Sequence, residues 1–146
     1  MTTPLDILIV EDEALIAMDL TAIIEDCGHR VVAEAPSLRA VKALPKDRQP
    51  DLAFVDLQLA ENSSGLDVCN LILDQWDHTM VVFVTANPSR LPPDMGGGHG
   101  VIAKPFSRAG VGLALEYLTQ CVRNPPPKLP LPASIATGPA FSRYLT

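Results

Sequence analysis

The chain has 146 residues, of which 47% are hydrophobic and 19% are charged, and its formal net charge is −6 at pH 7. This length fits one domain with a sizeable core, and the acidic balance argues against a nucleic-acid partner, which would require a basic patch. No apolar run approaches the length of a membrane span, and residues 1–6 lack the features of a signal peptide. We therefore expect a cytoplasmic protein that makes no membrane contact.

Apolar runs alternate with helical patterns along the first 122 residues, which favours an α/β fold. We expect five strands, at residues 5–10, 30–35, 52–55, 80–84 and 101–103. We expect helices at residues 13–27, after a cap at Ser37, at residues 66–75, and after a cap at Ser107. Such alternation implies right-handed crossovers and a doubly wound, five-stranded parallel sheet.

Two later stretches depart from this rhythm. Residues 87–100 are rich in proline and glycine, so the fourth helix is expected to be shortened or irregular. Residues 123–146 are rich in proline and predict an extended or partly disordered tail. Phe141, Tyr144 and Leu145 leave open a docking role for that tail, which includes docking onto the domain. The predicted organisation is thus a domain at 1–122 and a tail at 123–146.

The three cysteines lie far apart, each in a predicted helix, and they show no metal-ligand spacing. They are Cys27, Cys69 and Cys121. We expect small buried apolar side chains, with a redox role as the lesser alternative.

Polar side chains follow four of the predicted strands. Glu11 and Asp12 follow the first, Asp56 the third, Thr85 the fourth and Lys104 the fifth. Because the carboxyl ends of parallel strands share one edge of a sheet, these groups are expected to converge there. Three clustered carboxylates repel one another unless a cation is present, so the cluster itself predicts a metal site, and Mg²⁺ prefers such oxygen ligands.

The same set suits phosphoryl transfer to a carboxylate. Asp56 would be the nucleophile, Thr85 would donate its hydroxyl to a phosphoryl oxygen, and Lys104 would pair with another. The Lys104–Pro105 bond is a candidate for a cis peptide that aims the ammonium into the site. Taken singly, each residue also has an ordinary explanation, such as a helix terminus, a turn or a solvated charge. Their coincidence at four strand ends favours the shared chemistry.

The chain resembles the receiver domains of two-component response regulators over roughly residues 5–122. The matching motifs are Ile9-Val10-Glu11-Asp12-Glu13, Phe54-Val55-Asp56-Leu57, Phe83-Val84-Thr85-Ala86 and Ala103-Lys104-Pro105-Phe106. The resemblance implies strand order 2-1-3-4-5 and a histidine kinase that phosphorylates Asp56. It also implies Mg²⁺ held by Glu11, Asp12, Asp56 and the backbone carbonyl of Gln58, with Thr85 and Lys104 sensing the phosphoryl group.

A narrower likeness is to the receiver half of the anti-sigma-factor antagonists of the alphaproteobacterial general stress response. It is carried by residues 56–65 and by Thr85-Ala86-Asn87-Pro88. That protein type has a sigma-like domain ahead of its receiver, whereas here the first strand begins near residue 5, so a stand-alone receiver is expected. Its expected role is a phosphate sink, feedback or phosphorelay element in stress or sensory signalling, with a regulatory protein as a possible further partner.

Three positions concern how phosphorylation is read and removed. Receivers usually carry an aromatic residue three positions before the lysine, where this chain has Val101, so the common aromatic switch is absent. Gln58 and Asn87 stand two positions after Asp56 and Thr85, where they can flank an attacking water and set the rate of dephosphorylation. An ordinary role as loop polar residues is an equal alternative.

Three other functions compete with a signalling receiver, which would not itself be an enzyme. A small-molecule phosphatase acting through an aspartyl phosphate would need a second acid at position 58, where glutamine cannot transfer the proton. A flavin-phosphate module would need a loop of backbone amides after the first strand, where Glu11 and Asp12 instead repel phosphate. A receiver-like scaffold that is never phosphorylated is disfavoured because the full set of residues is present.

Overall fold

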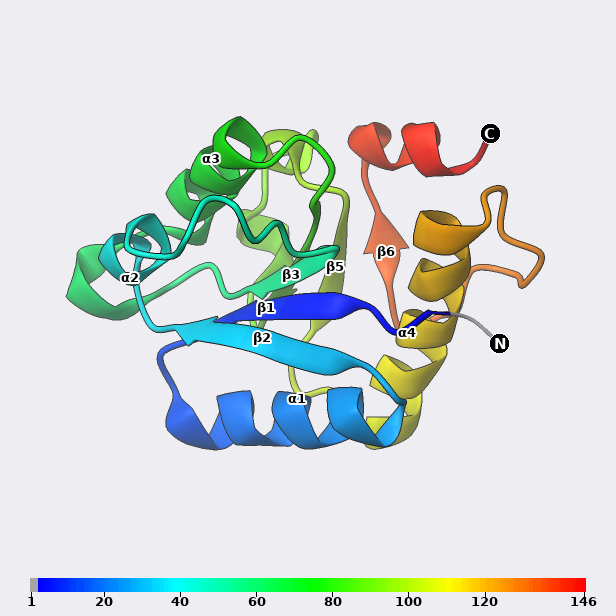
Figure 1. Ribbon diagram of the computed structural model, residues 1–146, viewed down its shortest axis with the longest axis horizontal. Helices are drawn as coiled ribbons and strands as arrows, with labels where there is room; N and C mark the ends of the chain where they lie inside the picture. Colours follow the sequence, from blue (N-terminus) through cyan, green and yellow to red (C-terminus); the bar gives the residue numbers. More distant parts are fainter. Residues whose placement is uncertain (1–2) are drawn as a thin grey trace.

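The protein is built on a single sheet with helices on both faces (Figure 1). The computed structural model describes residues 3–146. The strands are β1 (Asp6–Val10), β2 (Arg30–Ala35), β3 (Leu52–Val55), β4 (Met80–Thr85), β5 (Gly100–Ala103) and β6 (Ala136–Thr137). Their order is β2-β1-β3-β4-β5-β6. The first five strands are parallel and in the predicted order, and β6 adds an antiparallel sixth at the β5 edge.

Four α-helices and four short 3₁₀ turns connect the strands. The α-helices are α1 (Ala14–Asp26), α2 (Leu38–Lys42), α3 (Gly65–Gln75) and α4 (Arg108–Arg123). The 3₁₀ turns are η1 (Ala60–Asn62), η2 (Pro88–Arg90), η3 (Met95–Gly97) and η4 (Pro139–Tyr144). Ser37 and Ser107 cap α2 and α4 as predicted, since each side chain accepts a bond from the backbone N–H three residues on.

The expected irregular fourth helix is confirmed, because only η2 and η3 form between β4 and β5. Proline removes backbone donors from this segment, and Gly96 and Gly97 adopt positive φ angles of 60° and 90°, which a continuing α-helix does not allow.

Alternate strand residues supply two separate cores on opposite faces of the sheet. Ile7 and Ile9 point to the face that α1 and α4 cover, whereas Leu8 and Val10 point to the face that α2 and α3 cover. Because both faces are buried, β1, β3 and β4 read as continuous apolar runs and not as alternating ones. Across residues 3–146, no helix has both the length and the apolar character needed to cross a membrane.

The C-terminal segment differs from the extended or partly disordered tail that its prolines predict. Residues 136–137 pair with β5, and η4 places Phe141 against α4 with only 2% of its surface exposed. Ile135 is likewise buried in the core on the α1 and α4 side of the sheet. The apolar side chains of Ile135 and Phe141 thus fix the tail to the domain, in line with the docking role that the sequence leaves open.

The cysteine prediction is correct for two of the three side chains. Cys69 and Cys121 are buried, but Cys27 is exposed. Helix α1 ends at Asp26, so Cys27 lies at the C-cap, beyond the apolar stripe of that helix. Burial raises the pKa of the Cys69 thiol to about 12, which leaves it protonated at neutral pH.

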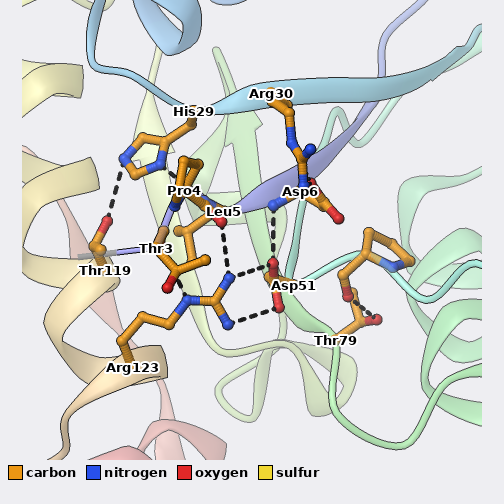
Figure 2. A network of polar contacts seen from close by, with 11 residues as sticks. Thr3, Pro4, Leu5, Asp6, His29, Arg30, Asp51, Thr79, Thr119 and Arg123 are labelled. Atoms are coloured by element: carbon orange, nitrogen blue, oxygen red, sulfur yellow. Dashed lines mark hydrogen bonds and ion pairs between the residues drawn. The ribbon is translucent and has the colours of Figure 1, made fainter. Parts of the chain in front are cut away.

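A polar network ties the end of α4 to the amino edge of the sheet, as Figure 2 shows. Arg123 donates to the carboxylate of Asp51 at 3.0 Å and to the backbone carbonyl of Pro4 at 2.9 Å. The same Asp51 carboxylate accepts the backbone N–H of Asp6 at 2.8 Å. His29 accepts the N–H of Leu5 at 2.9 Å, so its ring must be neutral there. This network lies at the opposite ends of the strands from the predicted site, so we assign it to stability.

Replacing Arg123 with methionine should lower the free energy of unfolding by about 1–2 kcal/mol, since it removes charge-assisted bonds that are only partly screened by water. Urea denaturation measures the change. Arg30→Met is the matched control, because the Arg30–Asp6 pair is far more exposed, with side-chain exposures of 68% and 34%. The control should cost less than about 1 kcal/mol. Equal losses in the two variants would contradict the assigned role of Arg123.

Candidate functional site

The predicted site residues lie at the carboxyl edge of the sheet, each at the end of its strand. Glu11 directly follows β1 and its backbone N–H binds the carbonyl of Ala35 at 3.0 Å. Asp56 follows β3, and its N–H binds the carbonyl of Val10 at 3.0 Å. Lys104 follows β5, and its N–H binds the carbonyl of Thr85 at 2.8 Å. The hydrogen-bond ladder of the sheet therefore continues into the candidate site and fixes the backbone of these three residues.

Lys104 joins two of the carboxylates directly. Its Nζ donates to Glu11 Oε1 at 2.7 Å and to Asp56 Oδ2 at 3.2 Å. Asp56 Oδ1 also accepts the N–H of Leu57 at 2.7 Å, and Glu11 Oε2 accepts the N–H of Glu13 at 3.2 Å. The peptide bond between Lys104 and Pro105 is cis. Both carboxylates are thus held in one orientation by backbone donors and by the ammonium group.

Three carboxylates form a compact oxygen-lined cluster. Glu11, Asp12 and Asp56 each offer an oxygen within 4.8 Å of the others. Glu11 and Asp56 are buried, with 6% and 8% of their surface exposed, whereas Asp12 is open to solvent. These hard oxygen donors, with Asp12 facing solvent, suit Mg²⁺. This ion retains several of its waters when it is bound by one or two carboxylates. The residues present therefore fit a divalent cation of this kind.

Burial and neighbouring charges have opposite effects on the pKa values within the cluster. Burial raises the pKa of Glu11 above its ordinary value, and the hydrogen bond from Lys104 offsets only part of this effect. Burial alone would lower the pKa of Lys104, but the bond to Glu11 and the charge of Asp56 outweigh it and raise that pKa. Lys104 therefore stays cationic at neutral pH and supplies one positive charge to three acidic groups.

Thr85 lies at the end of β4 beside this cluster. It pairs with Ala103, the residue before Lys104, and only 2% of its surface is exposed. Its hydroxyl accepts the N–H of Asn87 at 3.0 Å, which leaves the hydroxyl proton free to donate. Gln58 and Asn87 are both exposed on the loops that follow Asp56 and Thr85.

Gly65 directly precedes the helix predicted at residues 66–75, and the sequence pattern alone did not mark it as part of the site. It begins α3 and its N–H binds the carbonyl of Leu57 at 2.8 Å. A Cβ at this position would stand only 2.1 Å from the backbone carbonyl oxygen of Asp56. Only glycine lets α3 approach so closely behind the Asp56 loop. The Ser-Ser-Gly run that caps a helix was the available signal, but nothing local indicates this contact.

A comparison with protein families shows to which family the chain belongs. Residues 7–115 match the model of the response regulator receiver domain. The chain belongs to the response regulator receiver family. Its receiver fold and its place among two-component signal-transduction proteins, as the sequence motifs predict, are thereby confirmed.

The chain is similar in sequence to the regulators PhyR and DivK. It is 43% identical over 113 residues to the phyllosphere-induced regulator PhyR of Methylorubrum extorquens, an alignment that covers 76% of this chain and 42% of PhyR. It is 32% identical over 109 residues to the polar-differentiation response regulator DivK of Brucella anthropi, covering 71% of this chain and 87% of DivK. The chain thus spans less than half of PhyR.

A solved structure supports the same placement. The receiver domain of PhyR from Erythrobacter litoralis superposes with a TM-score of 0.72 at 31% identity, over 86% of this chain and 97% of that domain. The predicted link to the receiver half of stress-response anti-sigma-factor antagonists is consistent with these relatives.

Proposed function

We propose that this receiver accepts a phosphoryl group from a histidine kinase onto Asp56 with the help of Mg²⁺. The observation that carries the proposal is the contact of Lys104 with both Glu11 and Asp56 at the edge where three carboxylates meet. This arrangement holds a nucleophilic carboxylate, a fixed cation and a set of metal ligands within one small volume. Receivers are signalling regulators, so we assign no turnover of a small-molecule substrate to this chain.

Each residue has a defined task in this proposal. Glu11, Asp12, Asp56 and the backbone carbonyl of Gln58 would hold Mg²⁺, which neutralises charge on the phosphoryl oxygens when it is bound. Asp56 Oδ2 already points toward Lys104, so Lys104 would pair with a phosphoryl oxygen on that carboxylate. The Thr85 hydroxyl would donate to another.

The exposed side chains beside the site supply a further element of the proposal. We assign Gln58 and Asn87 to the control of dephosphorylation, since both lie on solvent-facing loops that leave Asp56 and Thr85. At these places the two amides can orient a water molecule that attacks the acyl phosphate. Their chemistry sets how long the signal lasts.

We further propose that the receiver serves as a phosphate sink, feedback or phosphorelay element in stress or sensory signalling. The likeness to PhyR and DivK supports a signalling role of this kind. A solved relative is the anti-anti-sigma factor PhyR of Bartonella quintana, which favours a kinase of the general-stress class and a regulatory protein as partners. The acidic net charge of −6 is in keeping with protein partners and not with nucleic acid.

Metal binding gives a prediction that does not require a kinase. Mg²⁺ at roughly a hundred times its dissociation constant should stabilise the wild-type chain by about 2.7 kcal/mol, seen as a rise in melting temperature relative to EDTA. Asp12→Asn should lose most of this rise because a solvent-facing ligand charge is removed. Asp47→Asn, an exposed acid in the loop before β3, should keep it in full. An undiminished rise in Asp12→Asn would contradict the assigned ligand set.

Phosphoryl acceptance can be tested first with a small donor. After incubation with acetyl phosphate and Mg²⁺, the wild-type chain should gain the mass of one phosphoryl group, and Asp56→Asn should gain none. An equal gain in the variant would place the acceptor elsewhere and reject the proposal for Asp56.

A further inference from the structure

Residues 57–64, here called the β3–α3 hairpin, fold back on themselves between β3 and α3. Gln58 and Ser64 face each other in an antiparallel bridge, and the N–H of Leu59 binds the carbonyl of Ser63 at 3.1 Å. The hairpin thereby fixes the backbone of Gln58. The side chain of this residue is assigned to the attacking water under the proposed function.

The tip of the β3–α3 hairpin has an unfavourable backbone conformation. Glu61 and Asn62 have φ angles of 61° and 56°, in the left-handed region that is costly for residues with a Cβ. Such a conformation persists only where surrounding contacts hold it in place. The position of Gln58 therefore depends on contacts that reach the hairpin from outside it.

The Ser63 hydroxyl supplies such a contact, because it joins the hairpin to α2. Ser63 Oγ accepts the N–H of Leu38, the first residue of α2, at 3.2 Å, and it donates to the carbonyl of Ala60 at 2.5 Å. The N–H of Leu38 is one of the amino-terminal donors that have no acceptor within their own helix. One hydroxyl thus satisfies a donor on the helix and an acceptor in the hairpin.

Other polar contacts between the hairpin and α2 cannot replace the Ser63 bridge. The N–H of Ala60 binds the carbonyl of Pro36 at 3.1 Å, but Pro36 lies ahead of the helix. Arg39 and Glu61 lie 3.8 Å apart, and their side chains are 85% and 56% exposed, so water screens this ion pair. A groove of about 390 Å³ is lined by residues of both elements, so side-chain packing does not close this boundary.

We propose that Ser63 is a positioning residue for the removal of the phosphoryl group, an inference that rests on the proposed function of Asp56 and Gln58. The Ser63 hydroxyl ties the hairpin to α2 and so holds the Gln58 amide where it can orient the attacking water. In that reaction water attacks phosphorus and the bond from phosphorus to the Asp56 carboxylate oxygen breaks. Inorganic phosphate leaves with both protons of the water. Without the hydroxyl the hairpin tip relaxes, dephosphorylation slows and the signal lasts longer.

Hydrogen exchange tests whether the hydroxyl fixes the hairpin, and it requires no phosphorylation. The N–H of Leu59 should exchange at least roughly threefold faster in Ser63→Ala than in wild type. Ser64→Ala is the matched control, because the Ser64 hydroxyl accepts the N–H of Leu66 and caps α3 instead of α2. The control should leave the exchange of Leu59 unchanged. Equal exchange in Ser63→Ala and wild type would overturn the proposal.

The lifetime of the acyl phosphate tests the positioning role itself. After labelling with acetyl phosphate and removal of the donor, at saturating Mg²⁺, the label should decay roughly three- to tenfold more slowly in Ser63→Ala than in wild type. Ser63→Thr keeps the hydroxyl and should restore the wild-type rate, and Ser64→Ala should decay as wild type does. A wild-type rate in Ser63→Ala would overturn the proposal. A wild-type chain that takes up no label would instead reject the proposed function, and this role with it.

A double-mutant cycle separates positioning from a general structural effect. On a Gln58→Ala background, Ser63→Ala should slow the decay no further, because the amide that it positions is already absent. Leu38→Pro provides a second variant, since it removes the N–H that binds Ser63 at the first helical position, where proline is tolerated. It should slow the decay only when Gln58 is present. Equal slowing with and without Gln58, or failure of both Ser63→Ala and Leu38→Pro to fold, would overturn the proposal.

Discussion

Replacing Gly65 with alanine is expected to lower the free energy of unfolding by about 3 kcal/mol and to impair phosphoryl acceptance at Asp56. The new Cβ would lie 2.1 Å from the carbonyl oxygen of Asp56 and 2.8 Å from Cα of Leu57. Both atoms belong to backbone, so no side-chain rotation relieves the clash. Either α3 or the Asp56 loop must shift, and a shift of the loop moves the Asp56 carboxylate away from Lys104.

Urea denaturation and acetyl phosphate labelling measure the two effects of Gly65→Ala. The matched control is Gly112→Ala within α4, where the nearest atom to the new Cβ is Cys27 Sγ at 3.8 Å, an ordinary contact. That control should leave labelling unchanged and should stabilise the chain by up to about 1 kcal/mol through helix propensity. If Gly65→Ala retains wild-type stability and labelling, the close packing of α3 on the Asp56 loop is not what positions the site.

Acidification from pH 7 to pH 4 should lower the free energy of unfolding by about 3 kcal/mol through His99 alone. Burial, with a smaller effect from Arg143, lowers the pKa of His99 to about 4, whereas the unfolded chain has the ordinary value of 6.5. The ring is 2% exposed, and its Nδ1 accepts the N–H of Val81 at 2.9 Å, so protonation removes an acceptor inside the core. The unfolded state binds the proton more readily. The contribution is therefore complete above pH 6.5 and is lost as the pH falls toward 4.

Urea denaturation at several pH values between 7 and 4 isolates this contribution by difference. His99→Leu should show a flatter profile than wild type, since the carboxylates titrate in both proteins and cancel. His78→Asn is the control, because His78 is exposed, and it should retain the wild-type slope. Identical profiles for wild type and His99→Leu would contradict the role assigned to His99.

The sequence was sufficient to predict that the candidate site residues converge at one edge of the sheet. Glu11, Asp56 and Lys104 each directly follow an apolar run, and parallel strands bring their carboxyl ends to one edge, so these residues could be placed together without coordinates. The five-strand order and the irregular segment between β4 and β5 could be predicted for similar reasons. Both are encoded in short, local patterns of apolar residues, proline and glycine.

Features that depend on contacts between distant segments could not be predicted in this way. β6 is two residues long, and its pairing with β5 spans more than 30 positions, so the prolines around it dominated the local pattern. In the sequence Phe141 is an isolated aromatic residue, and only the folded structure places Tyr117 of α4 beside it. Nothing in the sequence around Gly65 indicates its close contact with the backbone of Asp56, which forms only when α3 packs behind that loop.

We propose that Asp56 takes a phosphoryl group from a histidine kinase in the presence of Mg²⁺. The most direct measurement is the transfer of radiolabel from a phosphorylated histidine kinase of the general-stress class to the full chain. The wild type should become labelled with Mg²⁺ but not with EDTA, and Asp56→Asn should remain unlabelled in both. Equal labelling of the wild type and Asp56→Asn would show that Asp56 is not the phosphoryl acceptor.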